Sequence, residues 1–506
     1  MPTPSESRVT VSGKPSKVVE LLRKRLRLSL GAMMFIVLGI GCVLGWVAHR
    51  AHVQRDAVAA ITTLRRNTRG SVYYDWQYTA GQGNKAAKPQ GPKWMRDALG
   101  QFDDDAKPRG PKWLRDALGP DVFDTVVNVN IEGDNVDDEL LENVGKLHGV
   151  EFLTIQGRAA PDLTPGGMAQ LRTLSRLKGL GVRGFTDSHG FVAGLTGKTR
   201  LRRLWLPEAA VTDDEMAIIG GFADLELLKV DGSNVTDRGF AHVANLKELS
   251  LLDMPGVRIT DLAPVADLVQ LDLLVLAPGR ATAARSVPGP GGPSSLEPLR
   301  RLTNVTQLIL GATRIEDQDL AVVGGLPKLY NLQMGARGIT EAGLARLAES
   351  KSLACIGLAD TSIADLRPLS PRLHAISTLW MENSHLTDAG IEPLSRAIRL
   401  TDLTIAGSRM TDAGLDHLAS LTSLLRLRLD RSAITDAGLA RLKSLKSLET
   451  LSLTETKLTD SSVETLAGFQ SLKSLNLDRT GISPAGIERL KQALPKARIS
   501  SARMPD

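Results

Sequence analysis

The chain repeats one pattern of apolar residues four times near its C-terminus, at a constant interval. Each copy begins with Leu-x-x-Leu-x-Leu or a close variant, and the copies start 24 residues apart at Leu400, Leu424, Leu448 and Leu472. The motif Thr-Asp-Ala-Gly-Leu, or a variant of it, follows each copy. A fixed interval of this kind predicts a chain of stacked units rather than one compact core, because each unit is too small to bury its own apolar face.

The same pattern extends over most of the chain. The third apolar residue of each segment marks one unit, and fifteen such markers precede a closing Ile499. The markers are Ile131, Ile155, Val182, Leu206, Val230, Leu251, Leu276, Leu310, Met334, Leu358, Met381, Ile405, Leu429, Leu453 and Leu477. Units of about 20 to 29 residues with this pattern are typical of leucine-rich repeats. We therefore predict an α/β leucine-rich repeat solenoid over residues 121–506, a curved arc with a parallel sheet on its concave side and short helices on its convex side.

An uninterrupted apolar segment lies before the repeats. Residues 28–48 contain no charged side chain, and as a helix they span roughly 32 Å against a hydrocarbon core of about 30 Å. A cleaved signal peptide is the alternative, but the paired small residues of a cleavage site are missing at the end of the segment. We therefore predict one transmembrane helix over 28–48, preceded by a basic tail over 1–27.

Basic residues are concentrated on one side of this segment. Six lysines and arginines lie within about 15 residues before it, and only Arg50 and Arg55 follow it closely. The positive-inside rule then predicts a cytoplasmic N-terminus and a repeat domain outside the inner membrane. Within the segment, Gly41 and Gly45 are spaced as in helices that pack closely against each other, a pattern consistent with a weak homodimer. The alternative is that glycine is simply common in transmembrane helices.

Several short elements connect this segment to the repeats. Apolar residues at helical spacing predict a juxtamembrane helix over 49–69, and an N-terminal cap follows over 70–120. The cap begins with a predicted strand in which aromatic and apolar residues occupy every second position. Such a strand either covers the first repeat or presents its aromatic rings to a ligand. The sequence Gly-Pro-Lys-Trp-(Met or Leu)-Arg-Asp-Ala-Leu-Gly then occurs in tandem, starting at Gly91 and at Gly110, and each copy predicts one short amphipathic helix.

These N-terminal features and the repeats resemble a known family. The matching residues are Leu44-Gly45-Trp46, Arg50-Ala51, Gln54-Arg55, Ala57-Val58, Ile61, Gly70, Val72, Tyr74-Asp75 and the Trp-Leu-Arg segment from Trp113 to Phe123. Together with the Thr-Asp-Ala-Gly-Leu repeats, they resemble single-pass, membrane-anchored bacterial leucine-rich repeat proteins. The resemblance implies a membrane-tethered interaction domain and no defined ligand. The doubled Pro-Lys-Trp segment departs from that pattern.

Composition and motifs give no indication of catalysis. The 62 basic residues exceed the 56 acidic ones, but the excess lies in the N-terminal tail, so nucleic acid is not the expected partner. Cys42 and Cys355 are the only cysteines, and the 8 histidines have no metal-ligand spacing. Nucleophile-elbow, P-loop and kinase motifs are missing, and the recurrent aspartates follow helix-capping threonines. We expect no enzyme, no cofactor and no metal site.

The outward positions of the concave strands are the expected binding face, and most carry small or polar residues. The exceptions are the candidate partner-binding residues Trp205, Trp380, Arg426 and Arg428. Trp and Arg are enriched at binding hot spots, although isolated surface aromatics are also ordinary. Trp380 should lie two strands from Arg428, roughly 10 Å away, so that the two contact one partner.

One unit is longer than the rest. Its marker residue, Leu310, lies 34 residues after the preceding marker, Leu276, because of a Gly- and Pro-rich insertion at about 277–298. The composition of the insertion is equally consistent with a loop that contacts a partner and with a surface loop that has no role. The function we predict is protein–protein interaction on the envelope side, with an unknown protein ligand on the concave face. The alternative is a structural envelope component or an adhesin that binds polysaccharide, for which several aromatics in line would be expected.

Overall fold

The computed structural model describes residues 30–63, 68–74, 78–79, 101–102, 124–133, 136–157, 165–184, 189–277 and 293–502. The chain forms two compact units, of which one contains residues 1–59 and 74–125 and the other residues 60–73 and 126–506. The basic tail, both copies of the tandem segment and most of the Gly- and Pro-rich insertion lie outside the described residues.

The N-terminal helix α2, Leu30–Thr62, is continuous. The sequence predicted a span over 28–48 and a further helix over 49–69, and the structure joins them because no Gly, Pro or cap separates the two. The portion Met34–Thr62 is long and apolar enough to cross a membrane, a test that a signal sequence also passes. Its first half exposes large apolar side chains, with Phe35 at 79% and Trp46 at 61%.

The character of α2 changes after residue 50. Ala51, Gln54 and Ala57 are buried on one face, and the Gln54 side-chain amide donates a hydrogen bond of 2.9 Å to the backbone oxygen of Asp124. The first half of α2 is therefore apolar and exposed, whereas its second half is amphipathic and packs with one face against the rest of this unit. The same unit contains a short antiparallel pair, β2 (Tyr78–Thr79) with β3 (Gln101–Phe102).

The second unit is built on one sheet that has seventeen strands among the described residues. Strand β1 (Thr68–Tyr74) pairs with β4, and every later strand runs parallel to the next one along the chain. The strands are β4 (Val126–Gly133), β5 (Phe152–Gln156), β6 (Gly179–Arg183), β7 (Arg203–Thr212), β8 (Leu227–Asn234), β9 (Leu251–Asp253), β10 (Leu273–Leu276), β11 (Gln307–Thr313), β12 (Asn331–Ala336), β13 (Cys355–Ala359), β14 (Thr378–Glu382), β15 (Asp402–Thr404), β16 (Arg426–Arg428), β17 (Thr450–Ser452), β18 (Ser474–Asn476) and β19 (Arg498–Ser500).

Short helices connect the strands. The α-helices are α5 (Asp138–Gly145), α6 (Pro165–Ala169), α7 (His189–Gly194), α8 (Asp213–Ile219), α9 (Asp237–Phe240), α10 (Leu320–Gly324), α11 (Glu341–Ala348), α12 (Ser370–Leu373), α13 (Leu415–Leu418), α14 (Asp436–Leu439), α15 (Val463–Ala467) and α16 (Pro484–Ala493). The 3-10 helices are η2 (Gln170–Thr173), η3 (Ala241–Asn245), η4 (Ala263–Val265), η6 (Glu297–Arg301), η7 (Asp317–Asp319), η8 (Arg367–Leu369), η9 (Ala389–Arg396), η10 (Asp412–Gly414), η11 (Ala440–Leu442) and η12 (Asp460–Ser462).

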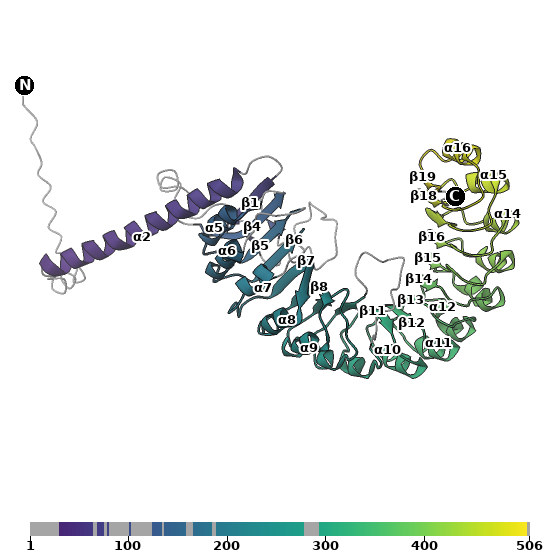
Figure 1. The fold of residues 1–506 in the computed structure, drawn as a ribbon, viewed down its shortest axis with the longest axis horizontal. Helices are drawn as coiled ribbons and strands as arrows, with labels where there is room; N and C mark the ends of the chain where they lie inside the picture. Colours follow the sequence, from purple (N-terminus) through teal and green to yellow (C-terminus); the bar gives the residue numbers. More distant parts are fainter. Residues whose placement is uncertain are drawn as a thin grey trace, which may run out of the picture. The chain divides into compact units, whose positions relative to one another are not determined.

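Within this unit the strands lie along the inner side of a curve and the helices along its outer side (Figure 1). Because a helix is wider than the strand spacing of about 4.8 Å, stacking the repeats curves the array towards its strands. The predicted leucine-rich repeat solenoid, with a parallel concave sheet and short convex helices, is confirmed.

The register corrects one marker. Leu251 pairs with Leu227 and Leu273, which are outward positions, so the equivalent of Val230 in the β9 repeat is Met254. The error arose because two patterns overlap here, Leu-x-x-Leu-x-Leu from Leu246 and Leu-x-x-Leu-x-Met from Leu249, and the structure uses the second one. Burial of Met254, which is 0% exposed, fits this register.

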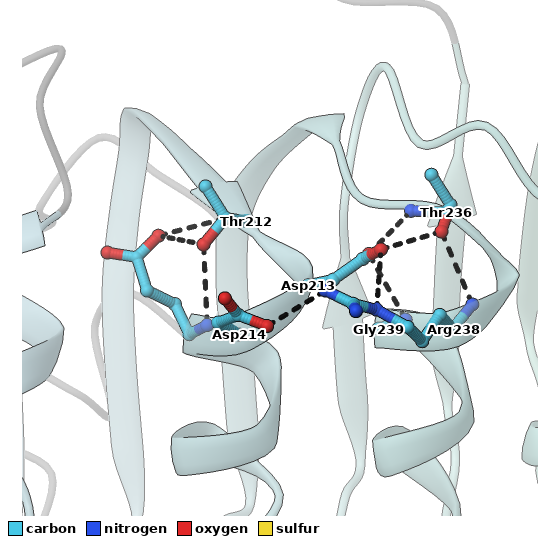
Figure 2. A network of polar contacts seen from close by, with 7 residues as sticks. Thr212, Asp213, Asp214, Thr236, Arg238 and Gly239 are labelled. Atoms are coloured by element: carbon cyan, nitrogen blue, oxygen red, sulfur yellow. Dashed lines mark hydrogen bonds and ion pairs between the residues drawn. The ribbon is translucent and has the colours of Figure 1, made fainter.

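The Thr-Asp-Ala-Gly motif and its variants join neighbouring repeats, as Figure 2 shows for the variants Thr-Asp-Asp-Glu at α8 and Thr-Asp-Arg-Gly at α9. Thr212 caps α8, and the next residue, Asp213, reaches the following repeat. Its carboxylate accepts hydrogen bonds from Thr236 N at 2.8 Å, from Thr236 Oγ1 at 2.7 Å and from Gly239 N at 3.1 Å. Burial alone would raise the pKa of Asp213, but these hydrogen bonds, with Arg238 nearby, lower it below its ordinary value of 3.8.

This Asp–Thr clamp recurs along the array. Further clamps are Asp237–Thr260, Asp317–Thr340, Asp388–Thr411, Asp412–Thr435, Asp436–Thr459 and Asp460–Ser483. The motif's glycine leaves room for the carboxylate, since a Cβ at Gly438 would lie 2.0 Å from Asp412 Oδ1. The aspartate thus has a second role besides its place in the first helical turn: it ties neighbouring repeats together.

Candidate partner-binding surface

Three of the four candidate residues lie together on the concave face, and the fourth lies apart. Trp380 on β14 pairs with Thr404 on β15, which in turn pairs with Arg428 on β16. Arg426 lies on the same strand and the same face as Arg428. Trp205 lies on β7, and strands β8 to β13 separate it from β14 in the described sheet.

A single carboxylate holds Trp380 and Arg426. The indole Nε1 of Trp380 donates a hydrogen bond of 3.0 Å to Asp402 Oδ1, and Arg426 Nε donates one of 2.5 Å to Asp402 Oδ2. Only 10% of the Asp402 side chain is exposed, compared with 52% of the Arg426 side chain. Asp402 therefore lies beneath the surface and fixes the orientation of both residues above it.

A second carboxylate holds Arg428. Its Nε and Nη2 each lie 3.3 Å from Asp430 Oδ2, and its Nη1 lies 3.5 Å from Glu382 Oε1. Asp430 is anchored in turn, because its Oδ1 accepts hydrogen bonds from Ser452 Oγ at 2.6 Å and from the backbone N–H of Thr454 at 2.9 Å. The guanidinium group is therefore held from below and from one side.

We call this set the β14–β16 patch; it comprises Trp380, Glu382, Asp402, Arg426, Arg428 and Asp430. The arginine of each pair is about half exposed, so solvent screens the attraction and the main effect of these ion pairs is on geometry. Side chains that are already ordered lose less conformational entropy when a partner binds. The patch is therefore suited to recognition more than to holding the fold together.

Each concave tryptophan lies against a glycine of the preceding strand. Gly357 pairs with Trp380, and a Cβ at Gly357 would lie 3.4 Å from Trp380 Cε3. Gly181 pairs with Trp205, and a Cβ there would lie 3.1 Å from Trp205 Cε3. Glycine leaves needed space for the ring at position 181, whereas a Cβ at position 357 would make an ordinary contact with the ring. In both cases a glycine one repeat before the tryptophan is visible in the sequence.

The surroundings of Trp205 differ from those of Trp380. Its indole Nε1 is buried and has no hydrogen-bond partner among the described residues. On the next strand Lys229, which pairs with Trp205, forms an ion pair with Asp253. Trp205 is therefore packed into the sheet without the carboxylate that orients Trp380.

Sequence reasoning missed the carboxylates and part of the concave face. Asp402 pairs with Arg426 in the register, and because they are 24 residues apart, the repeat length alone predicts that contact. The central strands β8 to β10 also differ from the expected small or polar surface. They carry Leu227, Leu251 and Leu273 in register at outward positions, where Leu227 and Leu251 are only 6% and 5% exposed, and the misplaced marker had concealed Leu251.

Within the described part of the chain, no group of three or more His, Cys, Asp or Glu side chains is arranged to hold a metal ion. The carboxylates of the β14–β16 patch bind arginine, tryptophan and backbone groups instead. What the patch offers chemically is a set of oriented guanidinium groups beside an indole.

The chain has the fold of a leucine-rich repeat solenoid. No protein-family model and no curated protein matches the sequence. Among solved structures it is similar to an internalin, inlF, from Listeria monocytogenes, with 20% identity, a TM-score of 0.42, and coverage of 73% of this chain and 90% of that one. It is also similar to a leucine-rich repeat protein of Leptospira interrogans, with 16% identity, a TM-score of 0.46, and coverage of 72% and 94%.

A plant structure is similar as well: the leucine-rich repeat ectodomain of the membrane receptor kinase GASSHO1/SCHENGEN3 from Arabidopsis thaliana, in complex with CASPARIAN STRIP INTEGRITY FACTOR 2. It has 13% identity and a TM-score of 0.31, and the match covers 73% of this chain and 56% of that one. At these identities the likeness is one of fold alone. The function must therefore be argued from the residues of this chain.

Proposed function

We propose that this protein is tethered to a membrane and binds another protein through the concave face of its repeats, without catalysing a reaction. The observation that carries the proposal is the β14–β16 patch, where Trp380, Arg426 and Arg428 are half exposed or exposed and held in place by recessed carboxylates. Tryptophan and arginine are the residue types enriched at binding hot spots. Their fixed orientation lowers the entropic cost of binding.

The exposed apolar half of α2 supports the membrane tether. Its side chains from Met34 to Trp46 would be costly in water and favourable in a hydrocarbon core. With the basic residues concentrated before it, this helix suits a bacterial inner-membrane anchor with a cytoplasmic tail and the repeats on the envelope side. A Cβ at Gly41 or Gly45 would meet nothing within 4 Å, so this face has room for the helix of a second copy.

The alternative, an adhesin or structural component that binds polysaccharide, needs aromatic side chains close enough to stack on neighbouring sugars. Trp205 and Trp380 are seven strand steps apart, which is roughly 30 Å along the sheet. Between them the sheet carries leucines at β8 to β10 rather than further outward aromatic rings. One isolated tryptophan beside arginines suits a protein surface better.

The test is crosslinking in native membranes followed by purification of the full-length protein and mass spectrometry. Trp380→Ala and Arg428→Ala should each reduce the captured partner by about tenfold or more, because loss of a hot-spot side chain costs about 2 kcal/mol or more of binding free energy. Arg441→Ala is the matched control, since Arg441 is paired with Asp416 on the convex side. If Trp380→Ala and Arg428→Ala capture as much partner as the wild type does, the concave patch is not the binding site.

A further inference from the structure

We infer that the partner presents an acidic polypeptide segment to this protein, and that Arg426, Arg428 and Arg431 bind it as a preformed cluster of guanidinium groups. The inference rests on the proposed function, since it names the chemistry of the partner at the same concave surface. Two observations support it: the depth of the charges and the convergence of two arginines.

The charges of the patch are separated by depth. The side chains of Arg426 and Arg428 are 52% and 50% exposed, whereas those of Asp402 and Asp430 are each 10% exposed. These two carboxylates lie below the guanidinium groups, whereas Glu382, whose side chain is 33% exposed, lies beside Arg428. An approaching molecule therefore meets Arg426 and Arg428 before it meets their recessed partners Asp402 and Asp430. Complementary charge across an interface favours the correct partner and speeds association.

The guanidinium groups also keep donors for a ligand. In its described contacts Arg426 uses its Nε for Asp402, and a guanidinium group has five N–H donors in a planar fork. That fork matches a carboxylate in a bidentate geometry. Glu382, at 3.5 Å from Arg428 Nη1, holds a position that a partner carboxylate would take over.

Arg431 follows Arg428 by three residues and reaches a side chain two repeats earlier. Its Nη2 donates a hydrogen bond of 2.8 Å to Asn383 Oδ1, and Asn383 directly follows Glu382, which Arg428 contacts. Gly407 lies between them, and a Cβ there would lie 2.8 Å from Asn383 Oδ1 and 3.5 Å from Arg431 Nη2. Because position 407 is glycine, the side chain of Arg431 can extend across that repeat. The guanidinium groups of Arg428 and Arg431 therefore converge on Glu382 and Asn383 at the end of β14.

The backbone at Arg431 is strained in a way that allows a clean test. Its φ is +56°, in the left-handed region, as it is at the equivalent positions Asp360, Asn383, Glu455 and Arg479, and the equivalent residue one repeat earlier is Gly407 with φ of +67°. A side chain at such a position costs roughly 1 kcal/mol relative to glycine. The fold accepts glycine at this position, so the arginine side chain can be removed without straining the backbone.

The experiment uses the full-length protein in detergent micelles and a fluorescein-labelled poly-L-glutamate peptide as the probe, with binding followed by fluorescence anisotropy. The wild-type protein should bind the poly-L-glutamate peptide, and its affinity should fall as the salt concentration is raised. The triple variant Arg426→Gln, Arg428→Gln, Arg431→Gly should bind about tenfold or more weakly, with the salt dependence reduced. Arg441→Gln, which removes one convex arginine, should bind as wild type does.

Folding is controlled through Arg431→Gly alone, because glycine suits the left-handed conformation and should leave the melting temperature unchanged or higher. Equal binding of poly-L-glutamate by wild type and the triple variant overturns the inference. So does binding of polygalacturonate, an anionic glycan, in place of poly-L-glutamate. If partner capture from membranes depends on Trp380 but not on the three arginines, the proposed function stands and only the acidic partner is wrong.

Discussion

Replacing Gly438 by alanine should destabilise the repeat unit by about 3 kcal/mol, a large effect for one methyl group. The new Cβ would lie 2.0 Å from Asp412 Oδ1 and 2.4 Å from its Cγ, so the Asp412 side chain must move. Its hydrogen bonds to Thr435 N at 2.8 Å and to Thr435 Oγ1 at 2.6 Å would then be lost. Chemical unfolding measures the loss. Gly468→Ala is the control, since the nearest atom to a Cβ there is the Thr465 backbone oxygen at 3.1 Å.

A double-mutant cycle separates this clamp from general crowding. Asp412→Ala alone should cost about 2 to 3 kcal/mol, because Thr435 loses an acceptor for two donors. In the double variant the methyl group introduced at position 438 enters the space that the Asp412 carboxylate has vacated, so the combined loss should be clearly smaller than the sum of the two single losses. Additive losses would show that glycine and aspartate act independently, and the explanation of the motif would then be wrong.

Deleting residues 30–48 should move the protein completely from the membrane fraction to the soluble fraction. These residues include the exposed apolar side chains of α2, among them Phe35, Leu38 and Leu44, and each one buried in lipid contributes about 1.5 to 3 kcal/mol. Fractionation with and without detergent measures the effect, and an unrelated apolar segment of equal length should restore membrane binding.

The same experiment distinguishes an anchor from a signal sequence. Mass spectrometry of the wild-type protein should find residues 30–48 still attached in the membrane fraction. A mature N-terminus after residue 48, with the protein soluble, would contradict the anchor and favour a cleaved signal peptide.

The repeat length made the fold predictable and brought three of the four candidate residues together. Residues 24 apart in neighbouring repeats pair across adjacent strands, as Thr404 and Arg428 do. The prediction went wrong at Leu251, where two overlapping apolar patterns fitted equally well and only the strand register distinguishes them. It also divided α2 into two helices, although the composition changes there without a helix break.

The finer features of the surface depend on side-chain and backbone geometry that periodicity does not carry. Periodicity places Asp402 beside Arg426, but the hydrogen bond from Trp380 Nε1 to Asp402 Oδ1 depends on how the two side chains are oriented. The reach of Arg431 depends on a left-handed backbone and on a glycine one repeat earlier. A pattern of apolar residues predicts which side of a strand is buried, and it leaves open which outward side chains contact one another.

The central claim, that a partner protein binds the concave face at β14 to β17, is tested most directly by site-specific photocrosslinking. A photoreactive amino acid replaces Thr450, which pairs with Arg426 on the neighbouring strand, and in a second variant replaces the exposed convex residue Lys443. Irradiation of cells should give a protein adduct from position 450 and none from position 443. An adduct from position 443 with none from position 450 would contradict the claim and place the partner on the convex side.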